Sequence, residues 1–377
     1  MNSIAPSVTF CRSAPAKAPS PEPEGWPTRH ESPRLRRMEA QLKTSPTVSM
    51  NMLAGYAAMA RPALYVIIVL CSLLGAFAYK LHTESIFACP ASGYGSEQYL
   101  AYCQTSGYGD YDHGAFWFGL EPDAQRAAAA ADVLFLGNSR MQFALSTEAT
   151  TRWFSSSSAL FYLLGFSYGE NSQFEGPLLG RLKPRAKAYV INVDRFFDED
   201  VVTSPVEAIR LRPADTQSND EEKKRWQVFH KGICATLPAL CGNAVAFFRS
   251  RSNGMWQLRG SENFKAAAVA DAAPETGDLD HLKRDAALGE KFLSQLPVDR
   301  RCVVLTVAPW GATKASEARA IADALKLDLV APNLEGLRTI DGDHLDRASA
   351  ERWATAFFKA AGPRIRECLR DTRKVAQ

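Results

Sequence analysis

Ser139 is the first side chain in this sequence whose type and position could do chemistry. It stands in the segment GNSR (137–140), directly after the apolar run ADVLFL. A serine on a tight turn that enters a helix is placed as a nucleophile, because the helix N-terminus favours developing negative charge. Many serines at such a turn only cap the helix, so a base and an acid are needed to support the interpretation.

The segment DGDHL near the C-terminus supplies that base and acid. A neutral His344 can take the proton of Ser139, and Asp341 can bind the other ring nitrogen and fix its tautomer. The alternative is an ordinary surface loop before a helix. The same Asp-x-x-His spacing occurs at Asp278 and His281, where N-capping of the amphipathic helix that follows explains the aspartate. We therefore assign the chemistry to the later pair.

Two further segments have glycine or polar residues at the ends of predicted strands. The backbone N–H groups of Gly165 and Gly169 can approach an oxyanion, because glycine has no side chain. Asn192 and Asp194 are two residues apart and can face the same side of a strand. The Asp194 carboxylate would repel developing negative charge unless it is protonated or paired, and Arg140 is the candidate partner.

These segments require a scaffold that brings several strand ends together. From about residue 121, short apolar runs alternate with amphipathic stretches, which predicts an α/β three-layer sandwich with a parallel five-stranded sheet. The predicted strands are 131–136, 159–164, 188–193, 302–307 and 327–331, and the predicted helices are 145–154, 170–182, 314–325 and 348–361. Reactive side chains in such a sheet lie at the carboxyl ends of the strands, where the polar segments stand.

Two regions depart from this alternation. Residues 198–279 contain a charged run and no strong strand, which predicts an insertion in the main domain, 121–365, that forms the substrate mouth. Residues 81–120 contain the aromatic and glycine-rich stretch GYGDYDHGAFWFGL. We expect a loop that packs its rings on the next domain, with a glycan-stacking surface as the alternative. Residues 366–377 are predicted to be a C-terminal tail.

Residues 62–79 are uncharged and are flanked by Arg61 and Lys80. This pattern predicts one transmembrane helix or signal anchor. A buried core helix and a signal peptide starting at Met50 are the alternatives. The first 61 residues contain eight basic and four acidic side chains, so we expect a cytoplasmic N-terminus and a periplasmic or otherwise extracytoplasmic main domain. The Pro- and Ser-rich residues 1–48 are predicted to be a disordered cytosolic tail.

An even number of cysteines follows the predicted span, which favours disulfides in an oxidising compartment. The natural pairs are Cys89 with Cys103, Cys234 with Cys241, and Cys302 with Cys368, although spacing does not fix the pairing. The cysteines lack CxxC and Cys/His ligand spacing, so we predict neither a metal nor a cofactor. After residue 61 the chain has 36 basic and 37 acidic residues, and this neutral balance argues against a nucleic-acid partner.

The order of GNSR, LGFSYG, INVD and DGDHL along the chain resembles the SGNH (GDSL-like) hydrolase superfamily, over about residues 130–362. The likeness is greatest to membrane-anchored bacterial members and implies a flavodoxin-like fold. It implies Ser139 as nucleophile, His344 as general base and Asp341 as the residue that orients it. It also implies the backbone N–H of Ser139, with that of Gly165 or Gly169, as oxyanion donors.

The sequence departs from the family pattern in two places. The G-D-S of the family is G-N-S here, and the G-x-N-D expected after the third strand is replaced by NVDRFF (192–197). Losing one oxyanion donor typically lowers a rate about 100- to 1000-fold. The second departure therefore supports a non-catalytic alternative.

The resemblance implies an anchored, extracytoplasmic serine esterase or O-acyltransferase that acts on acyl esters, expected on an envelope glycan, through an acyl-serine intermediate. The partners implied are the membrane and a membrane-bound acyltransferase. The alternative is a catalytically degenerate glycan-binding or envelope scaffold protein. The sequence does not separate hydrolysis from transfer, because the two differ only in how water is kept from the acyl-enzyme.

Overall fold

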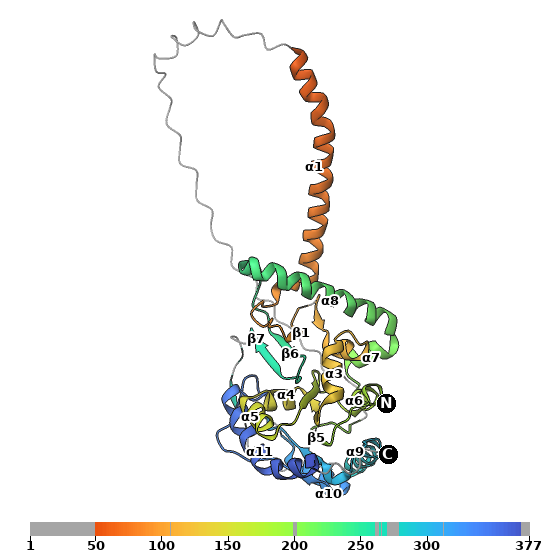
Figure 1. Cartoon of the computed structure of the whole chain (residues 1–377), viewed down its shortest axis with the longest axis vertical. Coiled ribbons are helices and arrows are strands. Elements are labelled where there is room, and N and C mark those ends of the chain that lie inside the picture. The colour runs from red at the N-terminus through yellow and green to blue at the C-terminus, as the bar shows by residue number, and fades with distance from the viewer. Residues whose placement is uncertain are drawn as a thin grey trace, which may run out of the picture. The chain divides into compact units, whose positions relative to one another are not determined.

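The computed structural model describes residues 50–105, 107–198, 202–260, 264, 266–269, 279–311 and 313–370. The chain divides into two compact units, residues 1–71 and 72–377. Figure 1 shows the helices and strands and labels most of the helices and several of the strands with the names used below. The predicted tail at residues 1–48 and the last residues, 371–377, lie outside the described residues.

Helix α1 (Met50–Glu84) contains the predicted membrane segment. In the described part of the chain it is the one helix with a stretch, Pro62–Lys80, that is long and apolar enough to cross a membrane, with a mean hydropathy of 2.1. None of the side chains in this stretch is buried. The uncharged run 62–79 therefore lies within one continuous helix, and its apolar side chains are exposed.

The larger unit, 72–377, is built on a parallel sheet of five strands. These strands are β3 (Val133–Asn138), β4 (Phe161–Phe166), β5 (Ala188–Asn192), β9 (Val303–Thr306) and β10 (Asp328–Leu329). Their spatial order is β10-β9-β5-β3-β4, with Val133 opposite both Phe161 and Ala188. The first strand thus lies inside the sheet, and the chain reverses its direction of winding there. Ligands of such sheets bind outside the carboxyl ends of the strands at this point.

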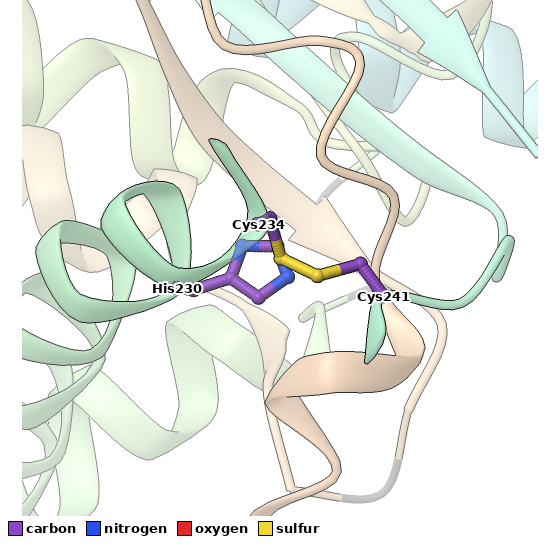
Figure 2. A group of neighbouring side chains, drawn as sticks. All are labelled: His230, Cys234 and Cys241. Atoms are coloured by element: carbon purple, nitrogen blue, oxygen red, sulfur yellow. A yellow bond between two sulfur atoms is a disulfide. The ribbon is translucent and has the colours of Figure 1, made fainter. Parts of the chain in front are cut away.

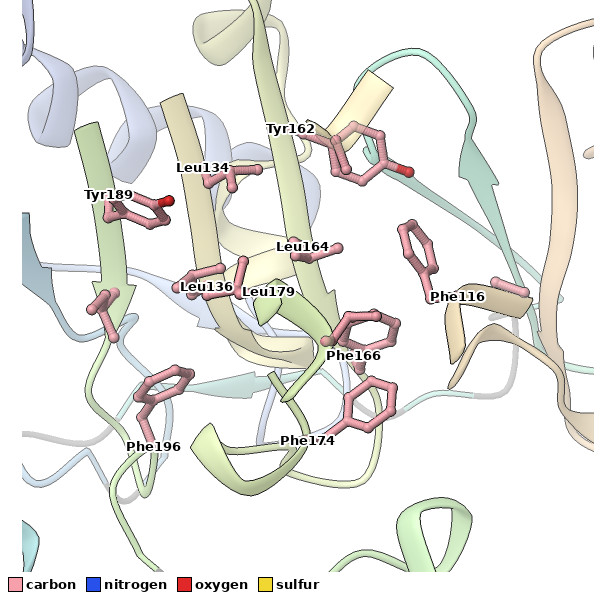
Figure 3. Packing of buried hydrophobic residues seen from close by; sticks show 14 of the residues in the cluster. Phe116, Leu134, Leu136, Tyr162, Leu164, Phe166, Phe174, Leu179, Tyr189 and Phe196 are labelled. Carbon is pink, nitrogen blue, oxygen red and sulfur yellow. The ribbon is translucent and has the colours of Figure 1, made fainter. Parts of the chain in front are cut away.

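Helices cover both faces of this sheet, as predicted. One face carries α3 (Pro122–Ala130), α6 (Ser172–Leu182), α9 (Leu279–Leu293) and α10 (Ala315–Leu325), and the other carries α4 (Ser139–Leu145), α5 (Glu148–Ser157) and α11 (Arg347–Arg370). Leu134 and Leu136 of β3 face the first core, and Val133 and Phe135 face the second. Figure 3 shows the first core, where Leu134 and Leu136 lie among rings and leucines of β4, β5 and α6. Both faces of the strands are buried, which explains their continuous apolar runs.

Two regions that were expected to lack strong strands form a second sheet. Strands β1 (Gln98–Cys103) and β2 (Gly109–Asp110) precede the parallel sheet, and β6 (Ala246–Ser250) and β7 (Trp256–Arg259) lie within residues 198–279. They pair antiparallel in the order β2-β1-β6-β7, with Tyr102 opposite Phe247. The prediction of no strong strand in 198–279 was therefore wrong. These strands are stabilised by partners far away in the sequence, which a local pattern does not reveal.

The aromatic stretch after β1 contributes to the first core. It contains helix α2 (Asp112–Trp117), and the rings of Tyr108, Tyr111 and Phe116 are buried. The ring centroids of Phe116 and Phe166 are 5.5 Å apart. Figure 3 labels both residues. These three rings are buried and cannot stack on a glycan, so the expectation that the stretch packs its rings on the next domain is confirmed for them. The expectation of a loop was wrong, because residues 81–120 contain β1, β2 and α2.

The helix predicted at 145–154 corresponds to α5, which begins and ends three residues later, and a separate helix, α4, precedes it. Helix α4 begins directly at Ser139, and α5 begins after Thr147, whose side chain accepts the Thr150 backbone N–H. The side chain of the preceding residue, Ser146, accepts the Trp256 backbone N–H at 2.8 Å. All five predicted strands begin and end within two residues of the observed ones. The other predicted helices also begin within two residues of the observed starts, which is the usual uncertainty of element ends.

Helix α11 continues past residue 361, where it was expected to end, and reaches Arg370. Residues 366–370, assigned to the C-terminal tail, are therefore its last turns. Cys368 in these turns forms a disulfide with Cys302, next to β9. The bridge fixes the end of the closing helix to the sheet.

All three natural cysteine pairs are disulfides, with Cα–Cα distances of 6.0, 6.0 and 5.6 Å for Cys89–Cys103, Cys234–Cys241 and Cys302–Cys368. The sequence separations are 14, 7 and 66 residues. Constraint of the unfolded chain grows with the loop that is closed, so the last bridge is worth about 4 kcal/mol and the second about 2 kcal/mol.

Candidate active site

Ser139 is presented by a turn in which β3 leads directly into α4. Asn138 caps the helix, because its Oδ1 accepts the Arg140 backbone N–H at 3.0 Å. Gly137 has a φ of +142°, and a Cβ added there would lie 2.8 Å from the Cβ of Asn192. The turn therefore requires glycine before the capping residue.

A hydrogen-bonded chain joins three side chains at this strand end. His344 Nε2 lies 2.8 Å from Ser139 Oγ, and His344 Nδ1 lies 2.7 Å from Asp341 Oδ2. A carboxylate accepts only, so we assign the proton to Nδ1, which leaves Nε2 to accept the hydroxyl proton of Ser139. The sequence analysis singled out these three residues, and the fold brings them into contact although Ser139 and His344 are 205 residues apart.

The loop between β11 (Arg338–Thr339) and α11 holds Asp341 in place. Its Oδ1 accepts the backbone N–H groups of Asp343 and His344 at 3.0 and 2.9 Å. Burial alone would raise the pKa of Asp341, but the hydrogen bonds from His344 and from these N–H groups hold that pKa below its usual range. Asp341 is therefore ionised at neutral pH and can stabilise a positive charge on the imidazole.

Arg140 neutralises the carboxylates beside the three residues. Its guanidinium forms an ion pair with Asp194 and lies 3.4 Å from Asp343 Oδ1. It also stacks on Trp310, 3.6 Å from the ring centroid. Asp194 thus has the cationic partner that the sequence analysis named for it. Its charge is compensated close to the strand end where an oxyanion would develop.

Two asparagines link the ends of β3 and β5. Asn192 Nδ2 donates to Asn138 Oδ1 at 3.2 Å, and Asn192 Oδ1 accepts the Ala308 backbone N–H at 3.0 Å. Asn138 Nδ2 lies 3.2 Å from both the backbone oxygen and the carboxylate Oδ2 of Asp194. The Asn192 amide, predicted as a pocket group, therefore fixes the geometry of the strand ends.

Gly165 and Gly169, the candidate oxyanion donors, have different surroundings. Gly165 is part of β4 opposite Gly137, and a Cβ there would lie 2.6 Å from Met141 Cε and 2.9 Å from the Gly137 oxygen. Gly169 lies in the turn after β4 with a φ of +71°, and no described atom other than those of its chain neighbours lies within 4 Å of an added Cβ. Close packing explains Gly165, whereas the Gly169 backbone is the more open of the two.

Four side chains of the site were missed. Asp343 stands in the DGDHL segment and could have been named from its position there. Trp310 stacks on the guanidinium described above, and Phe143 lies 4.5 Å from His344 between ring centroids. Glu175 accepts a backbone N–H of the β3–α4 turn at 2.9 Å, and burial raises its pKa well above the usual range. The last three are placed by packing and have no local signal in the sequence.

Of the discounted Asp-x-x-His pair, the described residue, His281, has no contact with Ser139, His344 or Asp341 among those found in the described part of the chain. Asp278 lies outside the described residues. His281, in the first turn of α9, has Nδ1 3.4 Å from Asp285 Oδ2 on the same helix. Its nearest ionic partner is therefore local.

A third Asp-x-x-His, which the sequence analysis did not single out, forms a buried ionic cluster. His113 Nδ1 lies 3.1 Å from both carboxylate oxygens of Asp110, and His113 Nε2 lies 2.8 Å from Glu170 Oε2. The His113 side chain is fully buried. Burial lowers the pKa of His113, but the Asp110 charge and the hydrogen bonds outweigh it and raise that pKa to about 10. His113 is thus a buried imidazolium at neutral pH.

Figure 2 shows a group of metal-ligating residue types, His230, Cys234 and Cys241. The two sulfur atoms are bonded to each other as a disulfide, so neither is a thiolate. The ring nitrogens of His230 lie 3.2 Å from the Tyr94 hydroxyl and 3.1 Å from the Cys89 carbonyl oxygen. In this state the group joins the end of α8 (Pro213–Thr236) to the residues that follow α1.

Comparison of this chain with protein-family models, with curated proteins and with solved structures gave no match. The functional argument therefore depends on the geometry of the site.

Proposed function

We propose that this chain is a membrane-anchored serine esterase or O-acyltransferase of the SGNH type. The observation that carries the proposal is the hydrogen-bonded chain from Ser139 through His344 to Asp341, at the carboxyl edge of a parallel sheet. The strand order, with the first strand between the second and the third, is that of flavodoxin-like folds and agrees with the SGNH resemblance.

The proposed reaction has two halves. In the first, Ser139 Oγ bonds to the acyl carbonyl carbon while His344 Nε2 takes the hydroxyl proton. The tetrahedral intermediate then breaks the ester C–O bond, and the imidazolium protonates the leaving alkoxide, which departs as an alcohol. In the second, His344 deprotonates water or another hydroxyl group, whose oxygen bonds to the acyl carbon. The bond from that carbon to Ser139 Oγ then breaks, and the imidazolium returns the proton to Oγ. Water gives hydrolysis, and a sugar hydroxyl gives transfer.

Backbone N–H groups stabilise the oxyanion in this scheme. Ser139 is the first residue of α4, where a backbone N–H has no acceptor within the helix. The second donor is the N–H of Gly169 or Gly165. The segment NVDRFF (192–197) replaces the family's G-x-N-D and places Asp194 near the oxyanion. The ion pair between Arg140 and Asp194 nevertheless supports activity, because a paired carboxylate opposes an oxyanion less than a free one does.

The proposed location is the extracytoplasmic side of a membrane, with the N-terminus in the cytoplasm. The apolar stretch Pro62–Lys80 and the excess of basic residues before it support this orientation. The three disulfides agree with an oxidising compartment. An anchored enzyme is suited to an envelope substrate, and a membrane-bound acyltransferase remains the proposed partner.

The test compares the full chain with its Ser139→Ala variant in detergent micelles. A fluorophosphonate probe should label the wild type, and 4-nitrophenyl acetate should be turned over. Both signals should fall by a factor on the order of 10⁴ in Ser139→Ala, because loss of the nucleophile removes the covalent route. The matched control is Ser155→Ala, an exposed serine on α5, which should behave as the wild type does.

A folded wild type that neither labels nor turns over the ester would overturn the proposal. The non-catalytic alternative, a glycan-binding or scaffold protein with this fold, would then explain the molecule better. Equal labelling of Ser139→Ala and wild type would place the reactive group elsewhere.

A further inference from the structure

A cavity whose lining does not include Ser139 lies in the same unit, residues 72–377. It has a volume of about 510 Å³, within the range of small-molecule sites. Its walls come from β2, α2, α7 (Ser204–Leu211), α8 and the turn after β4. Helix α8 lines it with one face, through Asp215, Thr216, Asn219, Asp220 and Lys223. The cavity therefore joins the segment before the parallel sheet to the segment that follows β5.

The ionic side chains of this cavity are balanced in charge. Three carboxylates and three cationic groups line it: Asp110, Asp215, Asp220, His113, Arg212 and Lys223. Lys223 Nζ lies 3.0 Å from Asp220 Oδ1, and it also donates to the Asp110 backbone oxygen. A ligand with a large net charge of either sign finds no excess of countercharge here. A neutral ligand rich in hydroxyl groups can use the donors and acceptors that are exposed in the lining, which belong to Arg212, Asp215 and Asn219.

Two of these groups have shifted pKa values. Burial raises the pKa of Asp220 to about 6, and His113 is the imidazolium described above. Gly114 belongs to the same wall, because a Cβ there would lie 1.7 Å from Asp220 Oδ2. A side chain at position 114 would displace Asp220.

Tyr168 gives the cavity an aromatic edge. Its side chain is half exposed, at 49%, and its φ of +62° is in the left-handed region that residues other than glycine rarely adopt. Its ring lies 6.4 Å from the His113 ring between centroids. An exposed ring held in a strained turn next to polar groups suits stacking on the apolar face of a sugar.

A row of rings leads from this edge to the candidate active site. Tyr168 lies 6.3 Å from Tyr102, and Tyr102 lies 5.3 Å from Phe247 between centroids. Phe247 lies 5.6 Å from Phe143, which lies 4.5 Å from His344. Tyr102, Phe247 and Phe143 are partly exposed. A series of ring contacts thus links Tyr168, at the edge of the cavity, to His344 of the candidate active site.

We infer that this cavity binds a neutral oligosaccharide, with a sugar ring stacked on Tyr168 and its hydroxyl groups bonded to Asn219 and the charged side chains. A sugar chain that leaves the cavity past Tyr168 would follow the row of rings toward Ser139. The inference goes beyond the proposed function, since it depends on the cavity and holds whether or not the serine is reactive.

The test measures binding directly and does not depend on turnover. Isothermal titration of the full chain in micelles uses the neutral hexasaccharides of glucose, N-acetylglucosamine and xylose, and hexagalacturonate as a charged counterpart, at millimolar concentrations. We expect saturable binding of at least one neutral hexasaccharide and none of hexagalacturonate. Tyr168→Asn and Asn219→Ala should each weaken that binding about tenfold, the loss expected for one stacking or hydrogen-bonding contact.

Matched variants separate binding from folding. Asparagine tolerates the left-handed backbone at position 168, and Tyr168→Phe keeps the ring and should keep the affinity. Ser218→Ala changes an exposed residue of α8 outside the cavity lining and should have no effect. Urea unfolding midpoints verify that each variant folds.

Three results would overturn the inference. They are failure of all neutral hexasaccharides to bind, binding of hexagalacturonate alone, and unchanged affinity in folded Tyr168→Asn. A protein without esterase activity that still binds would refute only the proposed function.

Discussion

Two histidines of this protein each follow an aspartate by three residues and bind it through Nδ1, but their second ring nitrogens have different partners. His344 presents Nε2 to the hydroxyl of Ser139, and its side chain is 18% exposed. His113 presents Nε2 to Glu170, and its side chain is 0% exposed. The two histidines have the same spacing from an aspartate and the same kind of partner at Nδ1. They differ in the partner of Nε2 and in their exposure to solvent.

This difference decides what each imidazole can do. A hydroxyl group can give its proton to His344 and take it back, so that ring can alternate between neutral and charged forms. A carboxylate on each side of His113 stabilises only the charged form. The first arrangement suits proton transfer, and the second holds the α2 segment to the turn that contains Glu170. An Asp-x-x-His spacing therefore identifies an orienting pair without identifying a base.

The largest effect that would test this comparison is expected for Asp341→Asn. The variant loses the carboxylate that sets the tautomer of His344 and stabilises the imidazolium, so esterase turnover should fall about 10³- to 10⁴-fold. The measurement is kcat/KM for 4-nitrophenyl acetate with the full chain. The control is Asp343→Asn, which keeps the Asp341 contacts and should lose much less. Comparable rates for Asp341→Asn and wild type would show that His344 needs no orienting carboxylate.

His113→Gln should act on stability. Removing a buried cation leaves the Asp110 and Glu170 side chains without their partner, which typically costs about 3–5 kcal/mol. The free energy of unfolding in urea measures the loss, and His344→Gln, at a partly exposed position, should change it by less than about 1 kcal/mol. Equal losses in the two variants would remove the distinction drawn between the two histidines.

The pH dependence of that loss gives its mechanism. The pKa of His113 is about 10 in the folded protein and about 6.5 in an unfolded chain, so the folded state binds the proton more tightly. Its stabilisation is complete below about pH 6.5, decreases as the pH rises, and is absent above about pH 10. The difference in unfolding free energy between wild type and His113→Gln should therefore shrink across this range. A difference independent of pH would mean that His113 acts by packing alone.

The smallest effect is expected at His281, the histidine of the Asp-x-x-His pair that the sequence analysis discounted. His281 lies 3.4 Å from Asp285 on its own helix and is a partly exposed ionic contact. His281→Gln should therefore change esterase turnover by less than about twofold and stability by less than about 1 kcal/mol. A loss of turnover similar to that of Asp341→Asn would transfer the proposed base to His281.

Much of the fold could be predicted, because local chemistry specifies it. Strands buried on both faces require continuous apolar runs, so β3 and β5 were recognisable within two residues. Strands β1 and β6 were not, since each is stabilised by pairing with the other across a long stretch of chain. The break between α4 and α5 was also missed. Ser146 and Thr147 can both cap a helix, and only the tertiary structure, in which Ser146 accepts the Trp256 backbone N–H, leaves Thr147 as the cap of α5.

The sequence by itself determined the apolar stretch Pro62–Lys80, the alternation of strands and helices, and the Asp-x-x-His pairs, because these depend on contacts within a few residues. Only the tertiary structure decided which histidine meets a serine and which meets a second carboxylate. Only the tertiary structure showed that Arg140, the candidate partner, pairs with Asp194, and that Tyr168 lies beside the cavity. The physical reason is that the partner of each second ring nitrogen arrives from another element, through packing of the sheet and helices, so its identity is a property of the fold.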